Sequence, residues 1–135
     1  MRNDKMLKTL LQITGGVMML AIGFVFCPFS WMQAIHKMIG LGELPFTPLM
    51  AYLTRSLSGL YVLMGFVLIF IAGDIPRYLN LLRALTWLSL AASVCLAVYD
   101  FVIEMPLFWS LSEGPATILL CGAILLLCRK IGRTS

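Results

Sequence analysis

The chain has 135 residues, of which 61% are hydrophobic and only 12% are charged. A typical soluble domain carries about 25% charged residues, so this composition excludes an ordinary water-soluble domain and predicts an integral membrane protein. The net charge is +4, but the basic residues flank apolar runs and form no patch with aromatic residues. This placement serves membrane topology and excludes nucleic acid as a partner.

Long apolar segments define the expected fold. A bilayer core about 30 Å thick needs about 20 apolar residues in a helix. Four segments are long enough: Leu10–Phe29, Leu49–Ala72, Leu82–Ile103 and Leu107–Cys128. The first is longer than a signal-peptide core and lacks a small-residue cleavage site, so we expect a retained helix. The sequence predicts an all-α fold, an integral membrane four-helix bundle, as a single transmembrane domain over residues 1–135.

The distribution of basic residues predicts the orientation of the helices. Eight of the ten Lys and Arg residues lie in the two tails or around the connection between the second and third segments. They are Arg2, Lys5, Lys8, Arg77, Arg83, Arg129, Lys130 and Arg133. Basic residues concentrate on the cytoplasmic side of membrane proteins, so we expect both termini to face the cytoplasm of a bacterial inner membrane.

The connections carry local signals of their own. In the first external loop, Trp31, Ile35, Met38 and Ile39 fall on one helical face, which predicts a short interfacial helix. The connection around Glu104, Met105 and Pro106 is very short and predicts a tight antiparallel hairpin. In the connection between the second and third segments, Asp74 and Arg77 are expected to pair locally at a helix start.

Ionisable residues inside the apolar segments are the main functional signal. Such groups are costly in a bilayer and usually face the bundle interior with partners. The candidates are Arg55, Asp100, Glu104 and Glu113. The predicted topology places all four in one layer in the outer half of the membrane. Asp100 and Glu104 are four residues apart, so they are expected to share a helical face.

Further polar residues are expected around this layer. Tyr52 and Ser58 accompany Arg55 on the second segment, and Tyr99 precedes Asp100 on the third. On the fourth, Glu113, Thr117 and Cys121 are spaced by four residues and are expected to share one face. A small-residue stripe, Ser89, Ser93 and Ala97, predicts close helix approach. Pro115 removes a backbone donor and is expected to bend the helix beside Glu113.

Several interpretations of this layer remain open. In the first, Arg55 neutralises one of the carboxylates in a purely structural ion pair. In the second, the layer is a polar pocket for a lipid, quinone or similar small hydrophobic ligand. The second interpretation includes a role as an accessory subunit. A membrane enzyme, an isomerase or oxidoreductase with a carboxylate as general acid or base, is a further hypothesis. The last hypothesis is that the protein is a purely structural subunit of a membrane protein complex.

A family resemblance rests on short motifs. These are Arg55 with Ser-Gly-Leu-Tyr in the second segment, Asp-Ile-Pro-Arg after it, Asp100 closing the third, and Glu-Gly-Pro opening the fourth. In these features the chain resembles an uncharacterised branch of the DoxX-like small four-helix bacterial membrane proteins. The resemblance implies the four-helix fold. Some DoxX-like relatives are implicated in thiosulfate- or quinone-linked redox chemistry, but no cysteine arrangement here maps onto such an activity.

No cofactor or metal site is predicted. The four cysteines, Cys27, Cys95, Cys121 and Cys128, include no C-x-x-C pair, and the single histidine, His36, is far from them in sequence. Metal sites need clustered ligands. Three of them lie within apolar runs, and we expect them to act as small apolar side chains.

Overall fold

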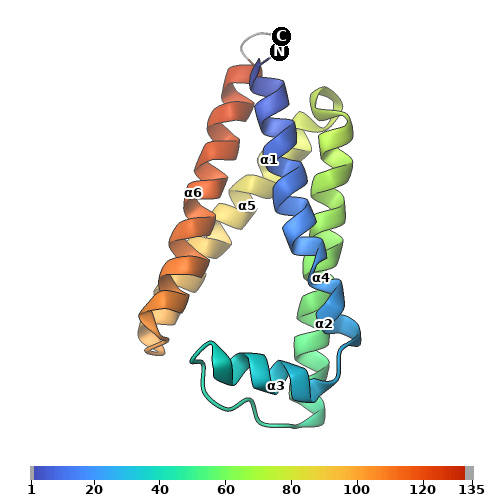
Figure 1. Cartoon of the computed structure of the whole chain (residues 1–135). Coiled ribbons are helices and arrows are strands. Elements are labelled where there is room, and N and C mark those ends of the chain that lie inside the picture. The colour runs from blue at the N-terminus through green and yellow to red at the C-terminus, as the bar shows by residue number, and fades with distance from the viewer. Residues whose placement is uncertain (1, 133–135) are drawn as a thin grey trace. The chain divides into compact units, whose positions relative to one another are not determined.

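The computed structural model describes residues 2–132, and these are helical with no β-strand (Figure 1). The helices are α1 (Arg2–Met19), α2 (Ile22–Phe26), α3 (Phe29–Met38), α4 (Pro48–Gly73), α5 (Ile75–Val102) and α6 (Leu107–Ile131). Four spans are long and apolar enough to cross a membrane: Asn3–Phe26, Pro48–Gly73, Ile75–Val102 and Leu107–Ile131. The chain is therefore all-helical, compatible with a four-helix bundle, and the four spans indicate a multi-pass membrane protein.

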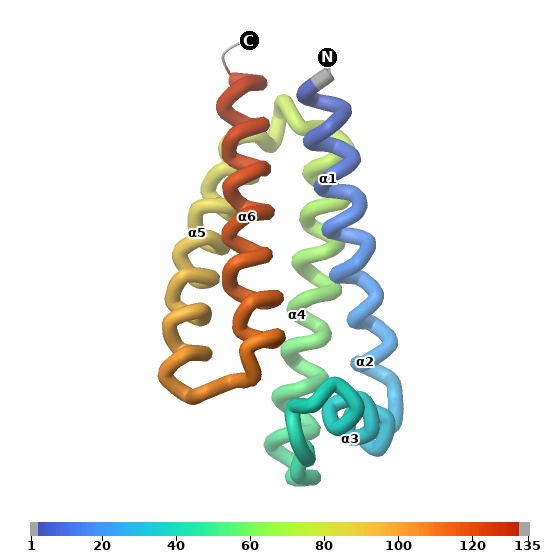
Figure 2. The backbone as a smooth tube through the Cα atoms, turned by 60° about the vertical axis from the view of Figure 1, so that its left-hand side comes forward, coloured from blue at the N-terminus to red at the C-terminus, as the bar shows by residue number. Residues whose placement is uncertain are grey.

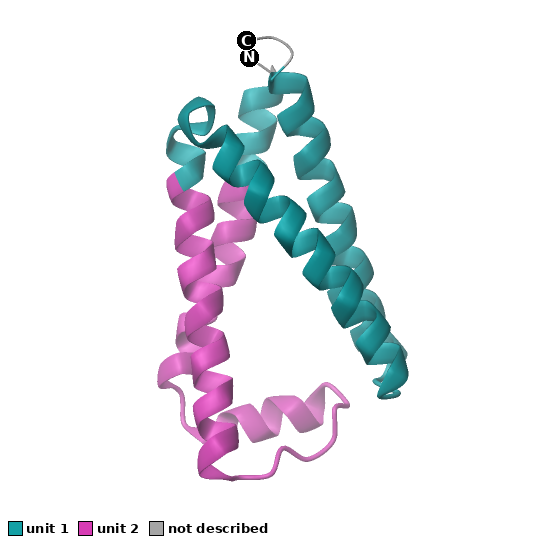
Figure 3. Ribbon diagram, turned by 180° about the vertical axis from the view of Figure 1, so that it is seen from behind, with its two compact units in different colours: residues 1–10, 71–135 teal, residues 11–70 magenta. Residues whose placement is uncertain are grey.

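The described residues group into two compact units (Figure 3). Unit 1 contains residues 1–10 and 71–135, and unit 2 contains residues 11–70. Unit 1 thus holds α5, α6, the start of α1 and the end of α4. Unit 2 holds the rest of α1 and α4 together with α2 and α3. The expectation of a single domain stays a prediction.

In unit 2, the first span is interrupted between α1 and α2. Leu20 N donates to Val17 O at 3.2 Å and Ala21 N donates to Met18 O at 3.1 Å, so the chain tightens to i−3 hydrogen bonds. The predicted first helix is thus two helices, and the chain is already helical from Arg2, eight residues earlier than expected. The hydrophobic length of the span was predicted, but the interruption was not.

A close approach of two glycines packs α1 against α4 within unit 2. Both Gly15 and Gly65 are buried, and a Cβ built on Gly15 would lie 2.7 Å from Gly65 O. A Cβ built on Gly65 would lie 2.6 Å from Gly15 O. Because no side chain fits there, the two backbones touch directly, as small residues allow between membrane helices.

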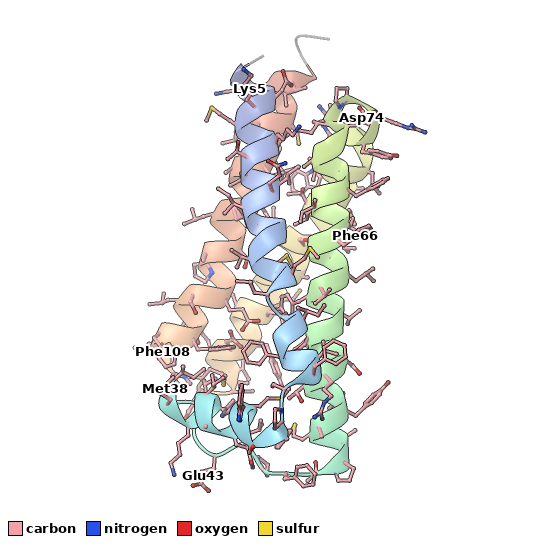
Figure 4. The ribbon with its side chains drawn as sticks, turned by 45° about the vertical axis from the view of Figure 1, so that its right-hand side comes forward. Lys5, Met38, Glu43, Phe66, Asp74 and Phe108 are labelled. Atoms are coloured by element: carbon pink, nitrogen blue, oxygen red, sulfur yellow. The ribbon has the colours of Figure 1, made fainter. Side chains whose placement is uncertain are left out.

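The loop between α2 and α4 contains the expected short helix, α3. Gly40 and Gly42 follow it with φ of 81° and 85°, a conformation that glycine adopts without strain. Lys37 Nζ lies 3.2 Å from Glu43 Oε1, and Gln33 Nε2 donates to Leu44 O at 2.8 Å. Figure 4 labels Glu43 in this loop and Met38 at the end of α3. These contacts fold the loop back along α3.

In unit 1, α5 begins seven residues before the predicted start at Leu82. Asp74 is the N-cap of α5, and its side chain accepts a hydrogen bond from Arg77 N at 3.3 Å, with Pro76 in the first turn. The expected local pairing of Asp74 with Arg77 therefore involves the backbone amide of Arg77. The Arg77 guanidinium lies over the Tyr78 ring, 5.5 Å from its centroid.

Helices α5 and α6 form the expected antiparallel hairpin, which Figures 1 and 2 both show. The buried positions of each helix recur with spacings of three, four or seven residues, the pattern of coiled-coil seams. On α5 they are Ile75, Leu82, Thr86, Ser93 and Asp100, and on α6 they are Ser110, Gly114, Cys121, Ile124, Cys128 and Ile131. Ser93 and Gly114 are small residues of the seam, and a Cβ on Gly114 would lie 2.6 Å from the Cβ of Ala97. The predicted small-residue stripe of α5 therefore lies at a close helix contact.

Candidate functional site

The structure assigns the predicted site residues to different units. Arg55, Ser58 and Tyr52 belong to unit 2, whereas the carboxylates belong to unit 1. The pairing of Arg55 with a carboxylate therefore stays a prediction. The unit 1 members are Asp100, Glu104, Glu113, Tyr99 and Thr117.

The unit 2 residues have local partners. Arg55 is half-buried, and its guanidinium donates to Ala51 O at 3.3 Å and to Cys27 O at 3.4 Å. The hydroxyl of Ser58 donates to Thr54 O at 2.8 Å, a bond to the carbonyl one turn back. Tyr52 is exposed. The carbonyl of Cys27 directly follows α2, so Arg55 ties α4 to the end of the interrupted first span.

In unit 1, Asp100 is the only one of the predicted site residues there that is fully buried in the described structure, at 6% exposure. It lies in the last turn of α5, on the seam that faces α6. Its carboxylate oxygen Oδ2 is buried and has no hydrogen-bond partner among residues 2–132. A carboxylate oxygen buried without a partner is costly, so this atom calls for a ligand, water or protein group.

A second unpartnered atom lies nearby on the same hairpin. Ser110 is 1% exposed, lies in the first turns of α6, and its hydroxyl has no partner in the described part of the chain. Ala97 contacts Gly114, which fixes how α5 and α6 are aligned. Along the antiparallel helices, Asp100 is three residues beyond Ala97, and Ser110 is four residues before Gly114. Asp100 Oδ2 and Ser110 Oγ therefore lie at adjacent levels of the seam. Ser110 is not one of the site residues named from the sequence, because nothing in a sequence marks a serine whose hydroxyl fails to bond its own helix.

The other acidic residues of unit 1 surround this pair less closely. Glu113 and Thr117 are half-buried beside the seam, which passes through Gly114 and Cys121. Of the expected face of Glu113, Thr117 and Cys121, only Cys121 thus lies on the buried stripe, and Glu113 is offset by one residue from its buried neighbour Gly114. The offset arises because α6 turns its small residue, Gly114, toward α5.

Glu104 does not share a helical face with Asp100. Helix α5 ends at Val102, and Glu104 lies in the connection with φ of 56° and an exposed side chain. The i, i+4 relation requires a continuous helix, so that expectation is wrong. Tyr99 is 58% exposed and also points away from the seam.

Pro115 lies within α6, which continues as a helix from Leu107 to Ile131. Its missing N–H leaves the carbonyl of Leu111 without its usual intrahelical donor. That carbonyl is one residue from Ser110, so the proline adds an acceptor close to the unpartnered pair. The bend expected at Pro115 stays a prediction.

Charge is polarised along unit 1. Residues 84–128 carry Asp100, Glu104 and Glu113 and no Lys or Arg. The opposite end of the unit carries Arg77, Arg83, Arg129 and Lys130, and Figure 4 shows the labelled Lys5 and Asp74 at that end and Phe108 at the hairpin end. Unit 1 therefore presents acceptors at one end and cationic donors at the other.

Within residues 2–132, no cluster of three or more His, Cys, Asp or Glu side chains could hold a metal ion. Comparison with known proteins adds no assignment: no family model, curated protein or solved structure significantly matches the chain. The resemblance to DoxX-like proteins accordingly stays a prediction.

Proposed function

We propose that this protein is a small non-enzymatic membrane protein that binds a hydrophobic ligand with a polar head, a lipid or quinone-like molecule, at the hairpin end of α5 and α6. The observation that carries the proposal is the buried, unpartnered Oδ2 of Asp100. At 6% exposure bulk water hardly reaches this atom, so its partner must be a bound molecule, an ordered water or another part of the protein.

The chemistry of the two atoms defines the ligand head. A carboxylate accepts hydrogen bonds, whereas a serine hydroxyl donates one and accepts others. A head group with a hydroxyl or amine donor, such as a lipid head or a reduced quinone, would satisfy Asp100 and Ser110 together. Glu113 beside the seam adds carboxyl oxygens that can accept hydrogen bonds from such a head group.

The basic end of unit 1 supports an orientation in the cytoplasmic membrane of a bacterium with both termini in the cytoplasm. The Asp100 site then faces the outer leaflet. A membrane-impermeant thiol reagent checks this orientation in intact cells. A single cysteine at Glu43, in a variant with the native cysteines replaced by alanine or serine, should be labelled, whereas one at Lys5 should not.

Native mass spectrometry of protein extracted from its own membranes in mild detergent tests the ligand. We expect a retained small molecule in the wild-type protein and its loss in Asp100→Leu. Glu104→Gln is the matched control, because Glu104 is exposed and its substitution should leave the ligand in place. Wild-type protein without a retained molecule, or equal retention in Asp100→Leu, would contradict the proposal.

A further inference from the structure

A groove lies between α5 and α6 at the end of unit 1 opposite Asp100. It has a volume of about 590 Å³ and is formed by both helices of the hairpin. Its lining residues are Arg83, Trp87, Gly122, Leu125, Leu126 and Arg129. None of them belongs to the proposed ligand site at Asp100.

The lining is ordered from charged to apolar along the helix axis. Arg83 bonds the carbonyl of Cys128, so Arg83 and Arg129 lie at the same level. Trp87 is one turn farther toward the hairpin on α5, and Leu126, Leu125 and Gly122 come before Arg129 on the antiparallel helix α6. Both helices continue from this level into their apolar segments. The groove is therefore cationic at its membrane edge and extends along apolar residues for about 10 Å, the length of helix from Arg129 to Gly122.

The position of the Arg83 side chain is fixed by α6. Its Nη2 donates to Cys128 O at 2.8 Å, and a Cβ at Gly132 would clash with the guanidinium. That carbonyl belongs to the last turn of α6, where the helix dipole is negative. A guanidinium carries five N–H donors in a planar fork, so one hydrogen bond to the protein leaves donors available for a phosphate.

The apolar part of the groove is open to the membrane. Trp87 is 60% exposed and Leu126 is 62% exposed. A Cβ built on Gly122 meets no atom within 4 Å, so this glycine leaves space in the groove. A tryptophan at this depth is typical of the interface between lipid head groups and acyl chains.

We propose that this groove binds an anionic glycerophospholipid of the leaflet on the side of the chain termini. The phosphate lies between Arg83 and Arg129, and an acyl chain lies along Trp87, Leu125 and Leu126 over Gly122. Charge complementarity selects this occupant, because two arginines at the membrane edge attract an anionic head group. The apolar part of the groove accommodates an acyl chain, which a free phosphate does not offer.

The test is native mass spectrometry of detergent-purified full-length protein with equimolar dioleoyl phosphatidylglycerol and dioleoyl phosphatidylcholine. Wild-type protein is expected to retain phosphatidylglycerol preferentially. Attraction of an anionic head group by each arginine is worth about a fivefold change in affinity, so Arg83→Gln/Arg129→Gln should bind it roughly 30-fold more weakly. Lys5→Gln, which removes one positive charge, is the matched control for each of the single variants Arg83→Gln and Arg129→Gln, because Lys5 is at the same end of unit 1 but outside the groove.

A second variant keeps the test independent of the arginines. Gly122→Leu fills the groove where the structure has open space and should reduce phosphatidylglycerol retention while leaving the protein folded. Asp100→Leu should not change this retention, so failure here and failure of the proposed ligand site are distinguishable.

Four results would overturn the proposal. The first is equal retention of the two lipids by the wild type. The second is the same loss in Lys5→Gln as in the double variant, and the third is displacement of the lipid by millimolar inorganic phosphate. The last is a dimer that Gly122→Leu dissociates, which would make the groove an interface between two copies.

Discussion

The two units use the same device for helix packing but treat their polar groups differently. In unit 2, Gly15 and Gly65 bring α1 and α4 into backbone contact, and in unit 1, Gly114 meets Ala97. In unit 2, the hydroxyls of Thr54 and Ser58 donate to carbonyls of their own helix. Among residues 2–132, the buried side-chain atoms without partners are Asp100 Oδ2 and Ser110 Oγ, and both lie in unit 1.

This difference separates hydroxyls that are satisfied by their own helix from polar atoms that need another partner. A hydroxyl bonded to the carbonyl one turn back is satisfied by its own helix, wherever that helix lies. Thr86 and Ser93 of unit 1 are of this type, with bonds of 2.7 Å to Leu82 O and 2.8 Å to Ser89 O. Asp100 and Ser110 depend on something beyond their own helices, which is why they define the candidate site.

The largest expected effect concerns the glycine contacts. Gly65→Ala should lower the free energy of unfolding by about 1–3 kcal/mol, because its Cβ would overlap Gly15 O. Gly114→Ala should have a similar effect in unit 1. Gly59→Ala is the control: a Cβ there meets nothing within 4 Å, so removing a helix glycine should raise stability by up to about 1 kcal/mol. Thermal denaturation in one fixed detergent measures all three, and equal shifts would contradict the close packing.

The next effect has the opposite sign. Asp100→Leu should raise the free energy of unfolding of ligand-free protein by about 1–3 kcal/mol, because it removes a buried polar atom that lacks a partner. The measurement is denaturation after exhaustive delipidation. A loss of stability would instead indicate that Asp100 has a partner within the protein, and Arg55 would be the first to test by a double-mutant cycle.

A smaller pair of changes compares two serines of the same hairpin. Ser110→Ala should raise stability by about 1 kcal/mol, since its hydroxyl is buried without a partner, whereas Ser93→Ala should lower it by about 0.5–1.5 kcal/mol. Both side chains are at least 90% buried, so the size of the cavity left by the substitution is alike. Effects of the same sign at both positions would remove the distinction between the two hydroxyls.

The smallest effect belongs to the loop of unit 2. Lys37 and Glu43 form an ion pair with side chains that are 71% and 85% exposed. Lys37→Gln should therefore change the free energy of unfolding by less than about 0.5 kcal/mol, as for most exposed ion pairs. A comparison of wild type and variant at low and high salt measures it, and a large salt-dependent loss would show that the loop depends on this contact.

The sequence predicted the helices well because hydropathy and length decide them. The second span was expected at Leu49–Ala72 and is Pro48–Gly73, and the last was expected to start at Leu107 and does. The start of α5 was missed by seven residues, because Arg77, Asn80 and Arg83 interrupt the apolar pattern. These residues nevertheless continue the helix from the Asp74 cap, since a membrane helix can extend beyond its hydrophobic segment.

The candidate site was predicted only in part, because hydropathy does not determine how a helix is rotated about its axis. Asp100 was predicted to be a buried charge and is buried. Glu104 was predicted to share its helical face, but it is exposed because the helix ends before it. The contact of Gly15 with Gly65 and the bond of Arg83 to Cys128 O were also missed. Each depends on two segments far apart in sequence, and no local pattern specifies such a pair.

The interruption between α1 and α2 has a consequence for backbone dynamics. Leu20 and Ala21 donate to carbonyls three residues back, a poorer geometry than the α-helical bond. Amides with weaker bonds open locally at lower free energy. In deuterated detergent solution, the amide hydrogens near residue 20 should therefore exchange faster than those of the intact turns around Gly15. The first span would then bend most easily at residues 20–21, where its backbone hydrogen bonds are weakest.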